Sequence, residues 1–419
     1  MNLYLGIDFG TSGARAVVID EQETIKAETQ SSFAVSEKNA NLAANWQKTL
    51  FSLIERINLE IREKIKAVAI NGTSSTVLLC NARGEPIEEP ILYNDGRAIA
   101  VKEKLQAIAP PNHVALSTTS SFAKLLWLRE NHQSSVENCY FLHQADWLAF
   151  LLHGKLGISD YHNALKLGYD TQNLCYPNWI QQLPALPKLP QVLAPGTPVG
   201  EVTPEISRNL GLPANCLVCT GTTDSIAAFL ASGAKSPGEA VTSLGSTLVL
   251  KLLSNTHVED SHYGVYRHRL GNLWLTGGAS NTGGAVLRHF FSDAELEKIS
   301  NQIDPQQEST LNYYPLLQPG ERFPLNDPHL PPQLEPQPAN SVEFLHGLLE
   351  SIARIEARGY QLLQKLGATK LTRIYTAGGG AKNTTWITMR ERHLQVPVST
   401  SKQTAAAYGT ALLAKRGAV

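Results

Sequence analysis

The chain has 419 residues, of which 42% are hydrophobic and 17% are charged, and its formal net charge is −1. This length and composition predict a globular protein of two domains or more and exclude a disordered one. The near-neutral charge favours a small-molecule partner and argues against nucleic acid and acidic membranes. No apolar run reaches the roughly 18 residues of a membrane span, and a strand pattern begins at once without a targeting segment, so we expect a cytoplasmic protein.

Five cysteines are scattered along the chain, an odd and sparse set that indicates a reducing compartment. Cys216 and Cys219 have the spacing of a redox or zinc motif, but they lie in the apolar run NCLVCTG, which has the pattern of a strand. Residues three apart on a strand point to opposite faces, and the sequence has no second such pair to complete a zinc site. We therefore expect both cysteines to be structural.

The first predicted elements are two strands around a glycine turn. Residues 4–8 and 14–20 are apolar runs separated by a turn that contains Gly-Thr-Ser-Gly, which is typical of a β-hairpin. Residues 46–65 have helical spacing and then lead into apolar runs over 66–72 and 75–81, which indicates a mixed α/β order. One face of the predicted helix contains Leu50, Ile54, Ile57 and Ile61.

The second half repeats the opening pattern. Residues 239–253 are again two apolar runs around a Gly-Ser-Thr turn, without the acid, which predicts two related domains. Residues 371–394 predict a strand, a triple glycine and a helix that starts near Asn383, and residues 404–416 form an alanine-rich last helix. Two proline-dense stretches are expected to be irregular connections, at 184–204 and 315–338.

Three short turns combine features that suit a phosphate chain. Glycine lets backbone N–H groups approach an anion closely, hydroxyls add donors, and a helix start adds partial positive charge. Each turn alone is more often a plain hairpin, but three in one chain predict a polyphosphate held between two hairpins. Asp8, at the tip of the first hairpin, would then hold Mg²⁺, largely through water. The three turns are Gly10-Thr11-Ser12-Gly13, Gly245-Ser246-Thr247 and Gly378-Gly379-Gly380.

Asp224 is the second acid that the sequence singles out. Residues 215–233 predict a strand, a polar turn and a helix, with Asp224 and Ser225 where the helix begins. One interpretation is a helix N-cap, for which Asp is a preferred residue. The other is a general base, because phosphoryl transfer to an alcohol needs positioning, charge neutralisation and one proton acceptor.

Eight segments in chain order carry a family resemblance. They are GIDFGTSGARAVVID (6–20), PILYNDGRA (90–98), SFAKLLWLREN (121–131), CTGTTDSIAAFLASGA (219–234), SLGST (243–247), PGERFPLNDP (319–328), GLLESIARIEARGYQLL (347–363) and TAGGGAKNTTW (376–386). They resemble, in the same order, the motifs of the FGGY carbohydrate kinases in the actin–Hsp70–sugar kinase superfamily. Tyr93 stands where the family usually has Trp.

The resemblance implies an α/β fold with two ribonuclease H-like (actin-like ATPase) domains and a cleft between them. We expect domain I, the FGGY N-terminal sugar-binding domain, at residues 1–231 plus 405–419. Domain II, the FGGY C-terminal ATP-binding domain, is expected at residues 232–404. The implied ligands are ATP, Mg²⁺ and a small sugar, and the two phosphate turns would act together when the domains close.

The resemblance also implies roles for single residues. Asp224 would be the general base, and Asp8 would organise Mg²⁺ and lie near the sugar. The implied sugar-binding residues are Asp8, Ser74, Asp224 and Ser225. The implied ATP-binding residues are Thr11, Ser12, Gly245, Thr247, Gly278, Gly379, Gly380 and Asn383. Weaker sugar-side candidates are Asn71, Asp95, Arg97, which could be a surface charge, and Asp146, which could be a helix cap.

Four longer segments resemble one subgroup of the family. Residues 70–80, 144–154, 159–170 and 239–253 resemble compact cyanobacterial and plastid proteins described as D-ribulose kinases and once labelled xylulokinase-like. The implied reaction is D-ribulose and ATP to D-ribulose 5-phosphate and ADP. The alternatives are a kinase for D-xylulose or another polyol, and a weak superfamily ATPase without sugar transfer. The chain is shorter than many members between Gly264 and Pro315, which leaves monomer and dimer open.

Overall fold

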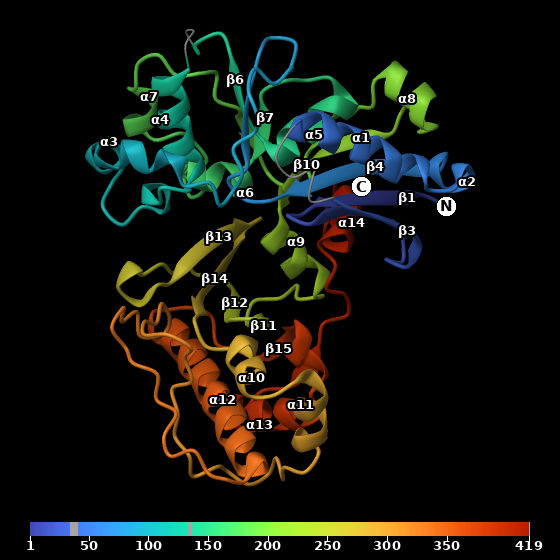
Figure 1. Cartoon of the computed structure of the whole chain (residues 1–419). Coiled ribbons are helices and arrows are strands. Elements are labelled where there is room, and N and C mark those ends of the chain that lie inside the picture. Colours follow the sequence, from blue (N-terminus) through green and yellow to red (C-terminus); the bar gives the residue numbers. More distant parts are fainter. Residues whose placement is uncertain (34–40, 133–135, 419) are drawn as a thin grey trace. The chain divides into compact units, whose positions relative to one another are not determined.

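The computed structural model describes residues 1–33, 41–132 and 136–418. The chain divides into two compact units, which we call unit 1 (Met1–Ala231 with Ala405–Val419) and unit 2 (Ser232–Thr404). The chain therefore passes from one unit to the other twice (Figure 1). In the described part of the chain, no helix is long and apolar enough to cross a membrane.

Unit 1 is built on a six-stranded sheet with the order β3-β2-β1-β4-β10-β9. Helices α1 and α5 lie on one face of this sheet, and α9 and α14 lie on the other (Figure 1). The strands are β1 (Leu3–Phe9), β2 (Gly13–Asp20), β3 (Ile25–Ser32), β4 (Ile65–Gly72), β9 (Pro198–Glu201) and β10 (Leu217–Thr223). Two small sheets join β5 (Val77–Cys80) to β6 (Tyr140–His143), and β7 (Ile158–Asp160) to β8 (Gln191–Leu193).

The helices of unit 1 are mostly short. They are α1 (Leu42–Glu55), α2 (Leu59–Arg62), α3 (Lys102–Ile108), α4 (Ser121–Asn131), α5 (Gln144–His153), α6 (Tyr161–Ala164), α7 (Asn178–Gln181), α8 (Pro204–Leu210), α9 (Asp224–Ala231) and α14 (Ala406–Gly417). Helix α14 lies directly against β1 and α9, where the backbones come so close that Gly6 and Gly409 have no room for a Cβ atom. The last helix therefore completes the core of unit 1.

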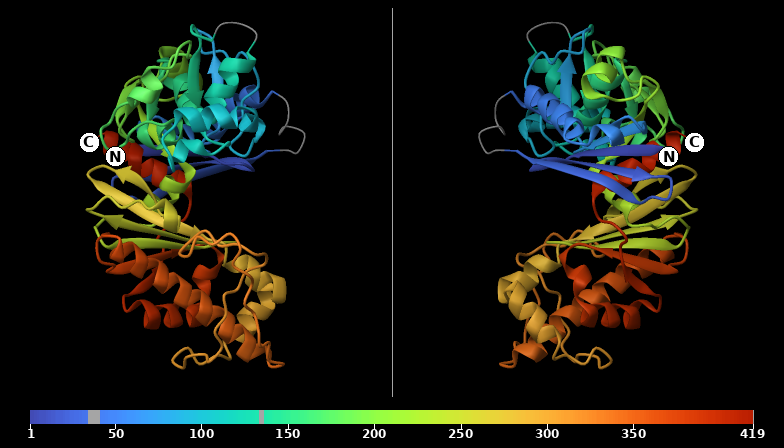
Figure 2. Two further views of the ribbon diagram at one scale, coloured as in Figure 1. Left: turned by 90° about the vertical axis from the view of Figure 1, so that its left-hand side faces the viewer. Right: turned by 90° about the vertical axis from the view of Figure 1, so that its right-hand side faces the viewer.

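Unit 2 has a six-stranded sheet with the order β13-β14-β12-β11-β15-β16. Its long helix α12 and the helix α13 cover one face of this sheet (Figure 2). The strands are β11 (Glu239–Leu244), β12 (Leu248–Ser254), β13 (Tyr266–Leu270), β14 (Leu273–Ser280), β15 (Arg373–Ala377) and β16 (Val398–Thr400). The helices are α10 (Gly284–Phe290), α11 (Asp293–Ser300), α12 (Ser341–Lys365) and α13 (Thr384–Leu394).

The two sheets have the same pattern of strand pairing around their central hairpins. In unit 1, β1 pairs with β2 antiparallel and with β4 parallel, β2 pairs with β3 antiparallel, and β4 pairs with β10 parallel. In unit 2, β11 takes the place of β1, with β12 and β14 on its antiparallel side and β15 and β16 on its parallel side. The repeated hairpin in the sequence thus marks two units of the same topology.

Two local predictions are wrong. The helix expected over 46–65 ends at Glu55, and the separate helix α2 begins after Asn58, whose side chain accepts a hydrogen bond from the backbone N–H of Glu60. An Asx cap of this kind competes with a continuous helix. The connection expected to be irregular over 184–204 contains the short strands β8 and β9. Residues 315–338 contain neither helix nor strand, as predicted.

The cysteines are free thiols in the structure. Cys216 and Cys219 are buried in the core at β10, and burial raises the pKa of each thiol to about 12. Protonated thiols are poor nucleophiles and poor metal ligands, which agrees with a structural role for the pair.

Candidate active site

Two acids lie where the central strands of unit 1 end. Asp8 is the penultimate residue of β1, and Asp224 follows β10 directly as the first residue of α9. Both strands flank β4 and run parallel to it, so their carboxyl ends share one edge of the sheet. The structure therefore brings together the two acids that the sequence singled out.

The charges of the two carboxylates influence each other. Burial and, to a lesser extent, the negative charge of Asp224 raise the pKa of Asp8 to about 6, although Arg15 and Asn71 act in the opposite direction. The Oδ1 atom of Asp8 is buried and has no hydrogen-bond partner among the described residues. Asp8 thus has an oxygen free for a ligand and is poised to change its charge near neutrality.

Asp224 is the first residue of α9. Its Oδ1 accepts a hydrogen bond from the backbone N–H of Ser225, at 2.7 Å, and the Ser225 side chain is exposed. A cation also faces Asp224: burial lowers the pKa of Lys166, and the charge of Asp224 opposes that shift. The sequence analysis missed Lys166, because a lone lysine in a short turn after α6 carries no motif of its own.

Asn71 ties this edge of the sheet to the last helix. It is fully buried on β4, in register with Asp8 on β1. Its Nδ2 donates to Thr410 Oγ1 of α14 at 2.6 Å and to the Ile7 carbonyl at 3.4 Å. Its Oδ1 has no partner among the described residues, so Asn71 combines a structural bond with one spare acceptor.

The turn after β4 carries Ser74, which is half-buried. Gln144 of α5 holds this turn, since its Oε1 accepts hydrogen bonds from the backbone N–H and the hydroxyl of Thr73, at 3.1 and 3.2 Å. At the other end of the turn, Thr76 Oγ1 accepts the backbone N–H of Tyr93 at 3.0 Å. The turn is therefore fixed on both sides of Ser74.

The weaker candidates have partners of their own. Arg97 makes a two-pronged ion pair with Asp95, with Nε and Nη2 donating at 3.0 and 2.8 Å, and its guanidinium lies 5.1 Å from the centre of the Trp127 ring. Asp146 accepts the backbone N–H and the ring Nδ1 of His143, at 3.0 and 2.9 Å, as the third residue of α5. The helix-cap interpretation of Asp146 is thus what the structure shows.

The first glycine turn forms the tip of the β1–β2 hairpin. Gly10 N–H donates to the Gly13 carbonyl at 3.0 Å, and Thr11 and Ser12 are exposed between them. The backbone of Ser12 accepts the N–H of Phe33. The two hydroxyl residues are therefore presented at a tip whose shape is fixed by backbone hydrogen bonds.

The other two glycine turns meet within unit 2. Gly378 has a φ of 87° and lies so close to Leu244 and Gly245 that a Cβ atom would approach the Leu244 carbonyl oxygen to 2.6 Å. The turn after β11 and the turn after β15 are consequently neighbours. Gly284 N–H also donates to the Gly245 carbonyl at 2.9 Å, and Gly283 packs on Thr247.

Gly278 belongs to the strand β14 and not to one of the three glycine turns. It sits within β14 opposite Leu250, and the Phe323 ring covers the position that a side chain would take. The glycines that touch the turn are Gly283 and Gly284, whose signal in the sequence was a second glycine pair just before a helix.

Asn383 is the N-cap of α13, as its position predicted. Its Oδ1 accepts the Trp386 backbone N–H at 3.0 Å, and its Nδ2 donates to Ser300 Oγ at the end of α11 at 2.8 Å. Thr385 Oγ1 donates to the Ser300 carbonyl as well. The Asn383 side chain therefore joins the start of α13 to the end of α11.

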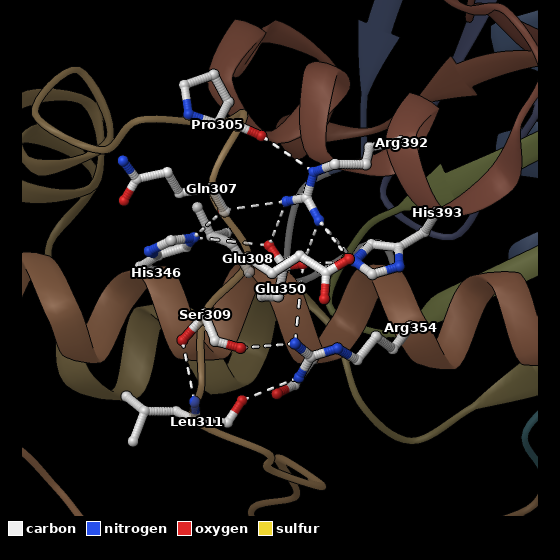
Figure 3. Close-up of polar contacts among 12 residues, drawn as sticks. Pro305, Gln307, Glu308, Ser309, Leu311, His346, Glu350, Arg354, Arg392 and His393 are labelled. Carbon is white, nitrogen blue, oxygen red and sulfur yellow. Dashed lines mark hydrogen bonds and ion pairs between the residues drawn. The ribbon is translucent and has the colours of Figure 1, made fainter.

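A charged cluster supports the far end of α13 (Figure 3). Glu350 of α12 is buried and accepts hydrogen bonds from Arg392 at 2.9 and 2.8 Å and from His393 Nε2 at 2.5 Å. Arg392 also donates to the carbonyls of Pro305 and Gln307, which belong to the segment that follows α11. The cluster therefore joins α12, α13 and the chain beyond Ser300.

The described residues show no group of three or more His, Cys, Asp or Glu side chains that could hold a metal ion. A cation bound at Asp8 would therefore rely on water and ligand oxygens for most of its coordination, which is the usual way that Mg²⁺ is held beside phosphates. The unpartnered Oδ1 of Asp8 fits that requirement.

Comparison with known proteins accounts for this arrangement. Residues 3–231 match the N-terminal domain of the FGGY family of carbohydrate kinases, and residues 240–418 match its C-terminal domain. The chain belongs to the FGGY family of carbohydrate kinases. The C-terminal family match includes helix α14, which packs in unit 1.

Individual FGGY relatives resemble the chain at low identity over almost its full length. Xylulose kinase from Staphylococcus xylosus is 22% identical over 449 residues, covering 100% of this chain and 91% of that protein. L-fuculokinase from Escherichia coli K12 is 23% identical, covering 94% of this chain and 88% of that protein. The crystal structure of xylulose kinase from Rhodospirillum rubrum matches with a TM-score of 0.83 at 19% identity, covering 100% of this chain and 90% of that one. The two-domain α/β fold of the FGGY sugar kinases is thus confirmed.

Proposed function

We propose that this FGGY kinase phosphorylates D-ribulose at its terminal hydroxyl, with ATP as donor and D-ribulose 5-phosphate and ADP as products. The observation that carries the chemistry is the pair of acids at the carboxyl edge of one sheet, where Asp8 and Asp224 repel each other and Lys166 faces Asp224. A small polyhydroxy substrate suits the polar groups at this edge, since hydroxyls can pair with carboxylates, an ammonium and Ser74.

In this proposal, Asp224 accepts the proton of the attacking hydroxyl. The charges of Lys166 and Asp224 attract each other, and the hydrogen bond from Ser225 N–H helps to orient the carboxylate. Ser74 and Ser225 would contact the sugar. A base positioned in this way gives direction to the attack, which is most of what a protein contributes to phosphoryl transfer.

Asp8 would hold the magnesium ion that accompanies ATP, and Mg²⁺ supplies charge neutralisation for the transferred phosphoryl group. Thr11 and Ser12 in unit 1 would donate to phosphate oxygens. In unit 2, the neighbouring turns with Gly245, Thr247, Gly379 and Gly380 would take the phosphates and the adenosine, and Asn383 would shape the corner. Gly278 is placed to support Phe323 and the corner only indirectly.

The choice of D-ribulose rests on the resemblance of residues 70–80, 144–154, 159–170 and 239–253 to D-ribulose kinases. A second candidate substrate is D-xylulose, its C3 epimer, because several relatives are named xylulose kinase. A site that hydrogen-bonds each hydroxyl separates epimers strongly, since an inverted hydroxyl leaves a buried polar group unpaired.

The decisive experiment is a sugar panel in a coupled ADP-release assay with the full chain. We expect the highest kcat/KM for D-ribulose among D-ribulose, D-xylulose, L-ribulose, L-fuculose and glycerol, and little ADP release without sugar. A higher kcat/KM for D-xylulose would change the proposed substrate to D-xylulose and leave the proposed kinase activity unchanged. ADP release that no sugar accelerates would instead favour an ATPase without sugar transfer.

A further inference from the structure

Lys124 is a fully buried lysine in the middle of α4. Its Nζ donates two hydrogen bonds of 2.6 Å, one to the Ser75 carbonyl and one to the Leu92 carbonyl. No carboxylate lies within ion-pair distance of this ammonium among the described residues. Burying a cation without an opposite charge costs stability. The two hydrogen bonds of Lys124 are therefore expected to serve a purpose other than stability.

The electrostatic surroundings underline that cost. Burial lowers the pKa of Lys124 to about 7; Asp95 acts in the opposite direction, whereas Lys166 and Arg97 add to the lowering. These are the charged groups that face Lys124 from the neighbouring segments. Asp95 is itself paired with Arg97 and shares its charge between the two cations.

Each carbonyl that Lys124 binds belongs to a segment of the proposed sugar side. Ser75 follows Ser74 directly and has a φ of 67°, a left-handed conformation that is strained for a residue with a Cβ atom. Its hydroxyl is buried without a partner among the described residues, so the turn gains nothing from that side chain. The carbonyl of this strained residue binds Lys124, in addition to the Thr76 N–H bond to the Thr73 carbonyl that closes the turn.

Leu92 begins the second segment, which continues through Tyr93 to Asp95 and Arg97. The two segments run side by side just before Lys124 joins them, because Val77 and Ile91 exchange two backbone hydrogen bonds of 3.0 and 2.9 Å. Beyond that pair, the Tyr93 N–H bond to Thr76 and the Lys124 ammonium are the links that keep the segments together.

We infer that Lys124 is a positioning residue for the sugar: its ammonium binds the carbonyls of Ser75 and Leu92 and so sets where Ser74 and Asp95 stand. This inference rests on the proposed placement of the sugar beside Ser74. Lys124 itself is enclosed by protein and acts through the two segments. Its loss should therefore affect the sugar and spare ATP.

The test compares Lys124→Met and Lys124→Gln with a matched control, Lys155→Met. Lys155 is also in unit 1 and also donates its ammonium to a backbone carbonyl, that of Val199, at 2.6 Å, but on an exposed part of the chain after α5. Thermal unfolding gives the folded fraction of each variant. Gln keeps an amide donor and is one atom shorter than Lys, so it removes the double contact with less disturbance than Met.

We expect kcat/KM for the sugar to fall by about 10- to 100-fold in both Lys124 variants, because small misplacements of a reacting group cost that much. The KM for ATP should stay within about twofold, and Lys155→Met should change neither constant. A Lys124→Gln enzyme with an unchanged sugar kcat/KM would overturn the inference. An equal loss for sugar and ATP would overturn it too, since it would indicate a general structural role.

Amide hydrogen exchange separates this inference from the proposed function. In Lys124→Gln without any ligand, residues 73–77 and 91–97 should exchange faster together, while unit 2 stays as in the wild type. Exchange that is unchanged in either segment would contradict the inference whatever the substrate. If the sugar panel identifies another sugar, the kinetic comparison is made with that sugar; if no sugar is phosphorylated, the proposed function fails and the exchange result still decides whether Lys124 holds the two segments.

Discussion

The two units contain contrasting examples of buried charged side chains. In unit 2, Arg390 and Glu356 are both buried and form two direct bonds of 2.6 and 2.8 Å, and Glu350 is bound by Arg392 and His393. In unit 1, the ammonium of Lys124 donates hydrogen bonds to two backbone carbonyls, and the largest charge effect on Asp8 comes from another acid, Asp224.

The pKa values follow this difference. Burial alone would raise the pKa of Glu350, but hydrogen bonds from His393 and Arg392 outweigh it and lower the pKa to about 2. Burial raises the pKa of Asp8 to about 6 and lowers that of Lys124 to about 7. Glu350 is thus ionised at neutral pH, whereas Asp8 and Lys124 are close to titration, which is what proton transfer and ligand binding require.

The sharpest way to break this comparison is Asp224→Asn. If Asp224 is the base, kcat should fall by about 10² to 10⁴-fold, because the amide cannot take a proton. The matched control is Asp293→Asn, which changes the first residue of another helix, α11, in unit 2. Coupled-assay kcat values for both variants check the expectation. A near-normal kcat for Asp224→Asn would show that Asp224 is not the general base.

The paired charges of unit 2 should instead affect stability. Arg390→Met leaves Glu356 buried without its partner, and breaking such a pair costs about 3–5 kcal/mol in the free energy of unfolding. The control is Arg373→Met, on an exposed position of β15. Urea unfolding should show the loss in unit 2, and a cost below about 1 kcal/mol would mean that the pairing contributes little.

A smaller loss is expected for Glu350→Gln, about 1–2 kcal/mol after allowance for solvent screening. Because folding lowers the pKa of Glu350 from 4.5 to about 2, its contribution is present above pH 4.5 and disappears as the pH falls toward 2. Thermal unfolding should therefore show a gap to the wild type at pH 7 and a clearly smaller gap at pH 3. Glu343→Gln, an exposed first-turn residue of α12, is the control and should show no gap at either pH.

The mildest perturbation leaves the sequence intact and changes the magnesium concentration. With a pKa of about 6 for Asp8, kcat/KM should decline below pH 6 as the carboxylate becomes protonated. A cation that binds the ionised form competes with the proton, so the decline should move to lower pH as Mg²⁺ is raised. If the pH of the decline does not change with the Mg²⁺ concentration, the decline belongs to another group and Asp8 does not bind the metal.

The sequence predicted those features that depend on neighbours along the chain. The two hairpins, the N-cap at Asn383 and the polar start of α9 all follow from local turn and cap chemistry. The break after Glu55 was missed because apolar spacing continued through a region where the cap at Asn58 decides the structure. Local rules rank such competing signals poorly.

Contacts between distant segments were beyond sequence reasoning. Nothing in α4 announces that Lys124 meets the carbonyls of Ser75 and Leu92, and nothing in α12 announces that Glu350 meets Arg392 and His393 of α13. Gly283 and Gly284 were not singled out from the sequence, because their contacts with Thr247 and Gly245 join segments that lie far apart in the chain. Backbone carbonyls carry no sequence identity, so partners of this kind become visible only in three dimensions.

The helix that completes unit 1 also orders events during synthesis. Asn71 binds Thr410, which is synthesised 339 residues later. At ordinary rates of translation, the ribosome needs on the order of 20–70 s to make this stretch. Until then β1 has no α14 to cover it, and the edge that carries Asp8 and Asp224 lacks one of its supports. A chain released before Thr410 would therefore bear both acids and yet lack the packing that orients them, so that the nascent protein acquires its chemistry only at the end of translation.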